Sequence, residues 1–258
     1  MKVVIFAGGM GTRLSEETSS VPKPMVRIGG RPILWHIMKL YSRCGFNDFV
    51  VLGGYRCEII KEYFFNYFIQ NSDVTFNLQD NSFRILSRHT EPWQVTVLDT
   101  GLATQTGGRL KRAEEFIGNE RFMLTYGDGL SDVNLNALLD FHLSHKRLAT
   151  MTSVQPEGRF GSLTINSESD QITSFVEKPK GDGTWINGGF FVCEPGVFRY
   201  LNQGDETVWE RRPLESLATD NELFAYKHTG FWKPMDTLRD KNQLEELWKS
   251  GSAPWKTW

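Results

Sequence analysis

The sequence has few cysteines, no long apolar run and almost no net charge. Its 258 residues contain three cysteines, Cys44, Cys57 and Cys193, which have neither CxxC nor zinc-ligand spacing. No run approaches the roughly 18 apolar residues of a membrane helix. The formal net charge is −2, so neither nucleic acid nor an anionic membrane is expected as a partner. Because the first residues also lack a signal-peptide cleavage pattern, we expect a reduced, cytoplasmic enzyme.

Common catalytic signatures are missing as well. No Gly-x-Ser-x-Gly elbow or cysteine–histidine pattern supplies a nucleophile, and none of the five histidines has metal-ligand spacing. The P-loop pattern is absent, and the dinucleotide fingerprint that starts at Gly9-Met10-Gly11 has Leu14 where it needs glycine. Covalent catalysis, P-loop hydrolysis and hydride transfer therefore lose support.

Buried-strand and helix patterns alternate in the first 70 residues. Residues 3–6 and 49–52 are continuous apolar runs, typical of strands buried on both faces of a parallel sheet. Residues 32–44 and 58–69 have helical spacing, with Pro32 suited to a first turn. This order predicts an α/β fold: a Rossmann-like mixed, mostly parallel sheet flanked by helices, with a smaller β-rich portion.

The rest of the chain continues with short elements and no repeat or linker, so we predict a single domain over residues 1–258. The further strands are expected at residues 74–78, 83–86, 95–98, 121–126, 149–154, 163–165, 172–176 and 188–193. The further helices are expected at residues 108–116, 134–145, 208–218 and 238–248.

A glycine-rich loop, Gly8-Gly9-Met10-Gly11-Thr12-Arg13, follows the first predicted strand. At the start of an α/β sheet, the N–H groups of such a loop can converge on anionic oxygens. Lys23 adds a second cation, and Pro22 and Pro24 restrict its backbone, which presents the side chain at low entropic cost. Two cations and a run of N–H groups suit a triphosphate. The alternative is a glycine turn with solvated surface charges.

Two aspartates are candidates for a metal site. Asp128 follows an apolar strand between Gly127 and Gly129, at the sheet edge where open α/β proteins bind ligands. Asp236 begins a predicted helix, which makes a helix N-cap the alternative role for this residue. Paired with Asp128, it would complete a carboxylate-poor Mg²⁺ site in which phosphate oxygens and water supply the other ligands.

Three later motifs are weak individually. Glu177-Lys178-Pro179 ends a predicted strand and again places a lysine beside a proline, although Lys-Pro at a strand end is usually a turn. Asn187-Gly188-Gly189 offers an amide and bare backbone for hydrogen bonds to sugar hydroxyls. Residues 254–258 read as an unstructured tail whose two tryptophans pack against another surface, such as a second subunit.

Taken together, these motifs resemble those of the sugar-1-phosphate nucleotidylyltransferases. The family signature is matched by Phe6-Ala7-Gly8-Gly9-Met10-Gly11-Thr12-Arg13-Leu14 and Pro22-Lys23-Pro24-Met25, followed by Tyr126-Gly127-Asp128-Gly129, residues 175–179, residues 187–189 and the Asp236 segment. A second set is similar to the cytidylyl-transferring branch: Ser15-Glu16-Glu17-Thr18, Glu91-Pro92-Trp93, Thr106-Gly107-Gly108-Arg109-Leu110, Gly158-Arg159-Phe160-Gly161 and the 254–258 tail. The likeness covers essentially the whole chain.

The resemblance implies transfer of a cytidylyl group from CTP to α-D-glucose 1-phosphate, giving CDP-glucose and pyrophosphate for deoxysugar (O-antigen type) synthesis. It implies Arg13, Lys23 and Asp128 as catalytic residues, Mg²⁺ on Asp128 and Asp236, and a homo-oligomer such as a hexamer. The nucleotide contacts that it implies are Phe6, Ala7, Gly8, Gly9, Met10, Gly11, Thr12, Arg13, Lys23, Thr104, Arg109 and Asp128. The sugar-phosphate contacts that it implies, in the β-rich sugar-binding portion, are Glu177, Lys178, Asn187 and Gly188.

Two alternatives stay open. One is the same chemistry with dTTP or UTP; Glu16 and Arg109 differ from many relatives in the way that the cytidylyl branch does, which weakens this reading. The other is a non-catalytic sensor of nucleotide sugars. A sensor could dispense with the metal carboxylates and the loop cations, whereas Arg13, Lys23, Asp128, Lys178 and Asp236 are all present.

Overall fold

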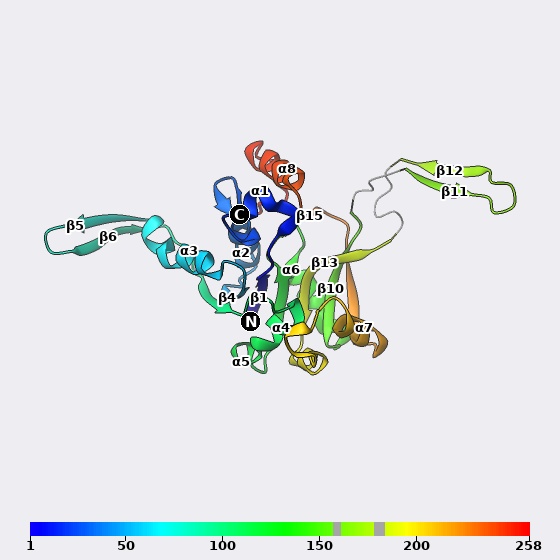
Figure 1. Cartoon of the computed structure of the whole chain (residues 1–258), viewed down its shortest axis with the longest axis horizontal. Helices are drawn as coiled ribbons and strands as arrows, with labels where there is room; N and C mark the ends of the chain where they lie inside the picture. Colours follow the sequence, from blue (N-terminus) through cyan, green and yellow to red (C-terminus); the bar gives the residue numbers. More distant parts are fainter. Residues whose placement is uncertain (157–160, 178–183) are drawn as a thin grey trace.

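A seven-stranded sheet forms the centre of the protein in a computed structural model that describes residues 1–156, 161–177 and 184–258 (Figure 1). Its strands are β1 (Lys2–Ala7), β4 (Asp48–Gly53), β7 (Gln94–Asp99), β8 (Phe122–Tyr126), β10 (Ala149–Val154), β13 (Ile186–Cys193) and β14 (Leu223–His228). They are ordered β14-β10-β13-β8-β1-β4-β7, and β13 runs antiparallel to both its neighbours while the other adjacent pairs are parallel. The predicted mixed, mostly parallel sheet is confirmed.

Helices cover both faces of this sheet, which explains the continuous apolar run in β1. Val3 and Ile5 join one buried cluster with α2, whereas Val4 and Phe6 join a second cluster with Leu110 on the opposite face. The helices are α1 (Ser15–Thr18), α2 (Ile33–Arg43), α3 (Cys57–Gln70), α4 (Thr106–Arg112), α5 (Glu114–Ile117), α6 (Leu135–His145), α7 (Arg212–Thr219) and α8 (Leu238–Lys249). The single helix predicted at 108–116 is thus two, α4 and α5. No helix in the described ranges has both the length and the apolarity to cross a bilayer.

Short elements complete the fold. The two-stranded pairs are β2 (Arg27–Ile28) with β3 (Arg31–Pro32), β5 (Ser72–Asn77) with β6 (Ser82–Arg88), β9 (Gly129–Ser131) with β15 (Trp232–Pro234), and β11 (Ser162–Ile165) with β12 (Ile172–Val176). The 3₁₀ turns are η1 (Thr12–Leu14), η2 (Lys23–Met25), η4 (Pro195–Tyr200) and η5 (Gly204–Glu206). The β5–β6 and β11–β12 hairpins project from opposite ends of the central body (Figure 1).

The C-terminal segment packs into its own chain, which corrects the prediction of an unstructured tail. Trp255 is fully buried and stacks on Phe231 at a centroid distance of 5.6 Å. Its indole Nε1 donates to His36 Nδ1 (3.3 Å), and Trp258 meets the Trp35 ring edge-on at 5.8 Å. These aromatic contacts fix residues 254–258 over helix α2.

The buried His36 gives the fold a pH dependence. Its Nε2 lies 2.8 Å from the Ile28 carbonyl oxygen and donates to it, because Nδ1 is the acceptor for Trp255. Burial, only partly opposed by the bond to Ile28, lowers the pKa of His36 from 6.5 to about 4. Between these values the unfolded chain binds a proton that the folded chain excludes, so stability falls as the pH falls through this window. The loss from this one group is about 3 kcal/mol.

Replacing His36 with glutamine should therefore flatten the acid side of the stability profile. The variant loses stability at pH 7 but should lose less than the parent between pH 6.5 and 4. His142, whose pKa burial also lowers to about 4, stays in both proteins, so the difference isolates His36. Urea unfolding at several pH values measures it; parallel profiles for the two proteins would contradict the assignment.

Candidate active site

The carboxyl ends of β1 and β8 start the two loops that carry the candidate catalytic residues. The strands pair in parallel, with Phe6 opposite Tyr126, so Gly8 and Asp128 emerge at the same edge of the sheet. Gly127 sits where the loops touch: its N–H donates to the Phe6 carbonyl (2.9 Å), and a Cβ there would lie 2.6 Å from that oxygen. A side chain at position 127 would push the loops apart.

Asp236 reaches Asp128 through a strand pair that the sequence does not reveal. β9 and β15 are antiparallel, with Gly129 opposite Pro234, and the Met235 N–H donates to the Asp128 carbonyl oxygen at 2.8 Å. This pairing brings together two aspartates that lie 108 residues apart in the numbering of the chain.

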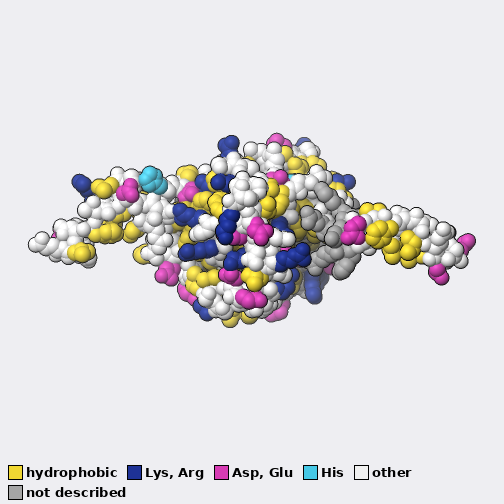
Figure 2. All heavy atoms as spheres, turned by 90° about the horizontal axis from the view of Figure 1, so that it is seen from above, with side chains coloured by type: hydrophobic (Ala, Val, Ile, Leu, Met, Phe, Trp, Pro, Cys, Tyr) yellow, Lys and Arg dark blue, Asp and Glu magenta, His cyan; other side chains and the backbone are white. Residues whose placement is uncertain are grey.

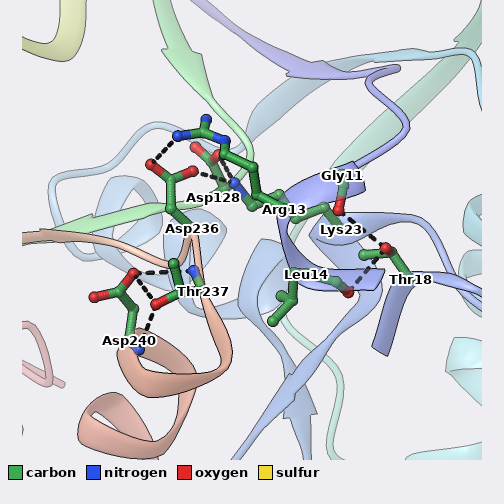
Figure 3. A network of polar contacts seen from close by, with 9 residues as sticks. All are labelled: Gly11, Arg13, Leu14, Thr18, Lys23, Asp128, Asp236, Thr237 and Asp240. Atoms are coloured by element: carbon green, nitrogen blue, oxygen red, sulfur yellow. Dashed lines mark hydrogen bonds and ion pairs between the residues drawn. The ribbon is translucent and has the colours of Figure 1, made fainter. Parts of the chain in front are cut away.

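Lys23 lies between the two carboxylates (Figure 3). Its Nζ is 2.6 Å from Asp128 Oδ2 and 2.7 Å from Asp236 Oδ1. Arg13 Nη1 approaches the second oxygen of Asp236 at 3.1 Å. Four of the residues expected at the site, Arg13, Lys23, Asp128 and Asp236, therefore form one charge cluster.

Exposure divides these cations into two kinds. The Lys23 side chain is 12% exposed, and the prolines before and after it hold it in the turn η2. Burial by itself would lower its pKa, but the adjacent Asp128 and Asp236 carboxylates outweigh burial and the pKa is raised. Lys23 is thus a fixed positive charge, whereas the Arg13 side chain, 73% exposed, is free to follow a ligand.

Asp236 does not cap helix α8, so the alternative role considered for it is wrong. The N-cap is Thr237, whose Oγ1 accepts from the Asp240 N–H (3.2 Å) while Asp240 Oδ2 accepts from the Thr237 N–H (2.9 Å). This reciprocal capping box satisfies the helix end and leaves the Asp236 carboxylate facing Lys23. Thr237-Leu238-Arg239-Asp240 fits the sequence pattern of such a box, which is the signal that could have identified the cap.

One side of the glycine-rich loop is hydrogen-bonded and packed against the protein, and the other side is exposed. Gly11 has a φ of 65°, a conformation that glycine adopts without strain, and its carbonyl accepts from Thr18 Oγ1 at 3.0 Å. Leu14 is buried beneath the loop, whereas Met10 is 52% exposed and nothing approaches the Cβ position of Gly9. The exposed side can therefore receive a ligand, and Phe6 and Ala7, both buried, can contribute through their backbone only.

Arg109 lies behind the loop and not on its open side. Its guanidinium is buried and donates to protein oxygens, among them Gly8 O (3.0 Å), Gly53 O (3.0 Å) and Thr100 Oγ1 (2.7 Å). Burial lowers the pKa of Arg109. Thr104 is also buried in this region. In this structure Arg109 holds together loops that follow β1, β4 and β7; contact with a nucleotide stays a prediction for both residues.

The expected sugar-binding residues are only partly gathered. Asn187 lies at the start of β13, at the same sheet edge, and its Nδ2 donates to the Tyr126 hydroxyl at 3.1 Å. The Gly188 carbonyl accepts from Trp232 Nε1 at 2.7 Å, which links β13 to the Asp236 segment. Glu177 is exposed at the end of the β11–β12 hairpin, and Lys178 lies outside the described residues.

Tyr126 is a site residue that sequence reasoning did not single out. Its ring stacks on Phe6 at 5.8 Å, and burial together with nearby Glu210 raises its pKa, so the hydroxyl stays protonated. Tyr126 thus connects Phe6, which lies just before the glycine-rich loop, to Asn187. No spacing pattern identifies such a residue, because its partners come from β1, from β13 and from the segment before α7.

The two aspartates fit a divalent cation with hard oxygen preference. One oxygen from each carboxylate faces a common point, as their shared contact with Lys23 Nζ shows. Among the described residues no group of three or more His, Cys, Asp or Glu side chains converges, so the protein offers few ligands. Mg²⁺ commonly binds through one or two carboxylates and completes its shell with water and substrate phosphates.

Residues 2–233 match the nucleotidyl transferase family, and the chain belongs to that family. Enzymes of this family generally use a divalent metal. The chain is 56% identical, over 100% of its length and 100% of the relative's, to "Glucose-1-phosphate cytidylyltransferase" of Salmonella typhi. The predicted family and enzyme class, a nucleotidyltransferase, are confirmed.

Two solved structures show the same fold at low identity. UDP-glucose pyrophosphorylase in complex with UDP-glucose has a TM-score of 0.68 at 16% identity, covering 97% of this chain and 98% of that one. The inositol-1-phosphate CTP transferase from T. maritima has a TM-score of 0.68 at 15% identity, covering 99% and 96%. They support the fold and leave the choice of base to closer relatives.

Proposed function

We propose that this enzyme transfers a cytidylyl group from CTP to α-D-glucose 1-phosphate, giving CDP-glucose and pyrophosphate. The observation that carries the proposal is full-length identity of 56% to a glucose-1-phosphate cytidylyltransferase. The cluster of Arg13, Lys23, Asp128 and Asp236 at the sheet edge gives it a chemical basis. The product suits deoxysugar synthesis of the O-antigen type.

The reaction needs no protein nucleophile. A phosphate oxygen of glucose 1-phosphate attacks the α-phosphorus of CTP in line, the new P–O bond forms, and the bond to the β-phosphate oxygen breaks. Pyrophosphate leaves with that electron pair. Catalysis then consists of positioning and of stabilising charge, as in other phosphoryl transfers.

We assign the roles of the two cations in this reaction from their different exposure. Lys23, buried and permanently charged, stabilises the charge that develops at the α-phosphorus. Arg13, exposed and paired only with Asp236 among the contacts described, neutralises the leaving pyrophosphate, and the N–H groups of residues 8–13 hold the phosphate oxygens. Asn187 hydrogen-bonds the sugar, and Lys178 and Glu177 complete the sugar-phosphate site. Thr104 and Arg109 remain predicted nucleotide contacts, and Arg109 would also support the glycine-rich loop from behind.

Asp128 and Asp236 would hold Mg²⁺ as the specific metal. When bound, Mg²⁺ supplies positive charge to the reacting phosphate oxygens. The two carboxylates supply the negative charge that a divalent ion needs, and Lys23 and Arg13 supply the positive charge that attracts a triphosphate.

A homo-oligomer such as a hexamer is part of this proposal. The projecting hairpins carry exposed hydrophobic side chains, visible in yellow at both ends of Figure 2. They include Phe76, Leu78, Phe83 and Leu86 on one hairpin and Leu163, Ile165, Ile172 and Phe175 on the other. Since a lone two-stranded hairpin is marginal in water, a second copy of the chain is the occupant that would cover these faces. Sedimentation velocity tests this; a monomer at micromolar concentration would contradict it.

The proposal also places the enzyme in the cytoplasm. Cys44, Cys57 and Cys193 are free thiols, two of them buried, which suits a reducing compartment.

A pyrophosphate-release assay with glucose 1-phosphate and Mg²⁺ tests the function, run in parallel with CTP, UTP, dTTP, ATP and GTP. We expect CTP to be used with a specificity constant at least about a hundredfold above the others, because a base site that hydrogen-bonds one ring edge leaves buried groups unpaired with the wrong base. Preference for UTP or dTTP would keep the chemistry and refute the base assignment. No release with any triphosphate would favour a nucleotide-sugar sensor or another sugar phosphate.

A further inference from the structure

Helix α8 contacts the segment after the glycine-rich loop through a second ion pair, outside the charge cluster. Glu17, in the short helix α1, accepts from Lys241 in the first turn of α8, with 2.5 Å between Oε1 and Nζ. The side chains are 31% and 22% exposed, so the pair is half-buried. Neither residue has a role in the proposed chemistry.

We infer that the Glu17–Lys241 ion pair is a positioning clamp that sets the distance between the loop cations and Asp236. The inference rests on the proposed function and adds two positioning residues to it. Both work through residues of the charge cluster, and neither touches substrate in this account.

The helix side of the clamp is rigidly joined to Asp236. Asp236 directly precedes the N-cap Thr237, and the capping box with Asp240 fixes the first turn of α8. The Lys241 N–H donates to the Thr237 carbonyl at 3.0 Å. A shift of Lys241 along or away from the loop therefore moves Asp236 with it.

The loop side is joined to Arg13 in the same way. Thr18, next to Glu17, donates through Oγ1 to the carbonyl oxygens of Gly11 (3.0 Å) and Leu14 (2.9 Å), which bracket Arg13 (Figure 3). The buried Leu14 anchors this turn in the core. Glu17 and Arg13 thus belong to one compact unit.

Two ion pairs join the loop unit to the helix unit, Arg13–Asp236 and Glu17–Lys241, and only the first is expected to break when substrate binds. The Arg13–Asp236 bridge must loosen, since in the proposed reaction both side chains take up phosphate and metal. The Glu17–Lys241 bridge has the opposite polarity, with the carboxylate on the loop and the cation on the helix, and nothing in the reaction competes for it. This contact can therefore hold the loop at a constant distance from helix α8 while Arg13 and Asp236 exchange each other for phosphate and metal.

The test compares Lys241→Met and Glu17→Gln with the charge-reversed double variant Glu17→Lys/Lys241→Glu. Lys249→Met is the matched control, because Lys249 forms an ion pair with Glu245 on the same helix at 3.4 Å and its side chain is 71% exposed. Two quantities are measured: hydrogen exchange of residues 8–20 in the free protein, and kcat and KM for CTP at saturating glucose 1-phosphate.

Each single variant should exchange residues 8–20 faster and have a KM for CTP raised about tenfold, because small misplacements of binding groups are costly. A single partly exposed ion pair adds little to stability, so the melting temperature should stay near that of the parent. The reversed pair should recover most of both losses, and Lys249→Met should change neither.

Single variants that match Lys249→Met in exchange and in KM would overturn the clamp. Because hydrogen exchange is measured without substrate, it decides the clamp even if the parent enzyme does not use CTP. Absence of CTP turnover in the parent would refute the proposed function separately.

Discussion

Asp128→Asn should lower pyrophosphate release from CTP by at least about a hundredfold, and by more if the metal is lost altogether. The substitution keeps the size of the side chain but removes the charge that pairs with Lys23 and that would hold Mg²⁺. The fold should survive, because Asp236 still pairs with Lys23 and the Asp128 backbone bond to Met235 is unchanged.

Kinetics across a range of Mg²⁺ concentrations measure this effect, with thermal unfolding as the check on structure. Asp140→Asn, on the exposed side of helix α6, is the matched control for an aspartate-to-asparagine change. An Asp128→Asn enzyme with normal turnover would remove the aspartate from the metal site.

Lys23→Ala is expected to slow turnover by about a hundredfold, corresponding to about 3 kcal/mol of transition-state stabilisation. The loss should fall mainly on kcat, because the buried ammonium faces charge that develops during the reaction. Removing it also leaves Asp128 and Asp236 facing each other as like charges, which raises the electrostatic cost of the unliganded site.

Steady-state kinetics with CTP separate these effects from a general change in surface charge. Lys2→Ala serves as the control, because Lys2 lies at the opposite, amino-terminal end of β1. If Lys23→Ala turns over like Lys2→Ala, the lysine has no catalytic role.

Local patterns predicted the elements that come from consecutive residues. The strands at 3–6 and 49–52 and the helices at 32–44 and 58–69 correspond to β1, β4, α2 and α3 within a few residues. Their signals are strong because both faces of the sheet are covered, so every residue of β1 and β4 after the first is buried.

The contacts that assemble the site could not be read in the same way. β9 and β15 have three residues each, which is too short to show an alternating hydrophobic pattern. They lie about a hundred residues apart, so no turn sequence between them indicates that they pair. The neighbouring residues and the family resemblance predicted Asp128 and Asp236 as site residues. That the two side chains lie close together depends on the β9–β15 pairing, which the sequence does not reveal. Trp255 was misjudged for a similar reason: its partners, His36 and Phe231, lie far away in the chain.

The β9–β15 pair also fixes when activity can arise during synthesis. The ribosome makes the glycine-rich loop first and Asp128 about halfway through the chain, but residues 232–236 follow only after all seven strands of the central sheet have been made. Until then the nascent chain has the glycine-rich loop and Asp128 but no Asp236, so Lys23 has only one carboxylate partner. The growing polypeptide can therefore fold its central sheet while it is still inactive. Activity becomes possible only when Asp236 has been made and β15 has paired with β9.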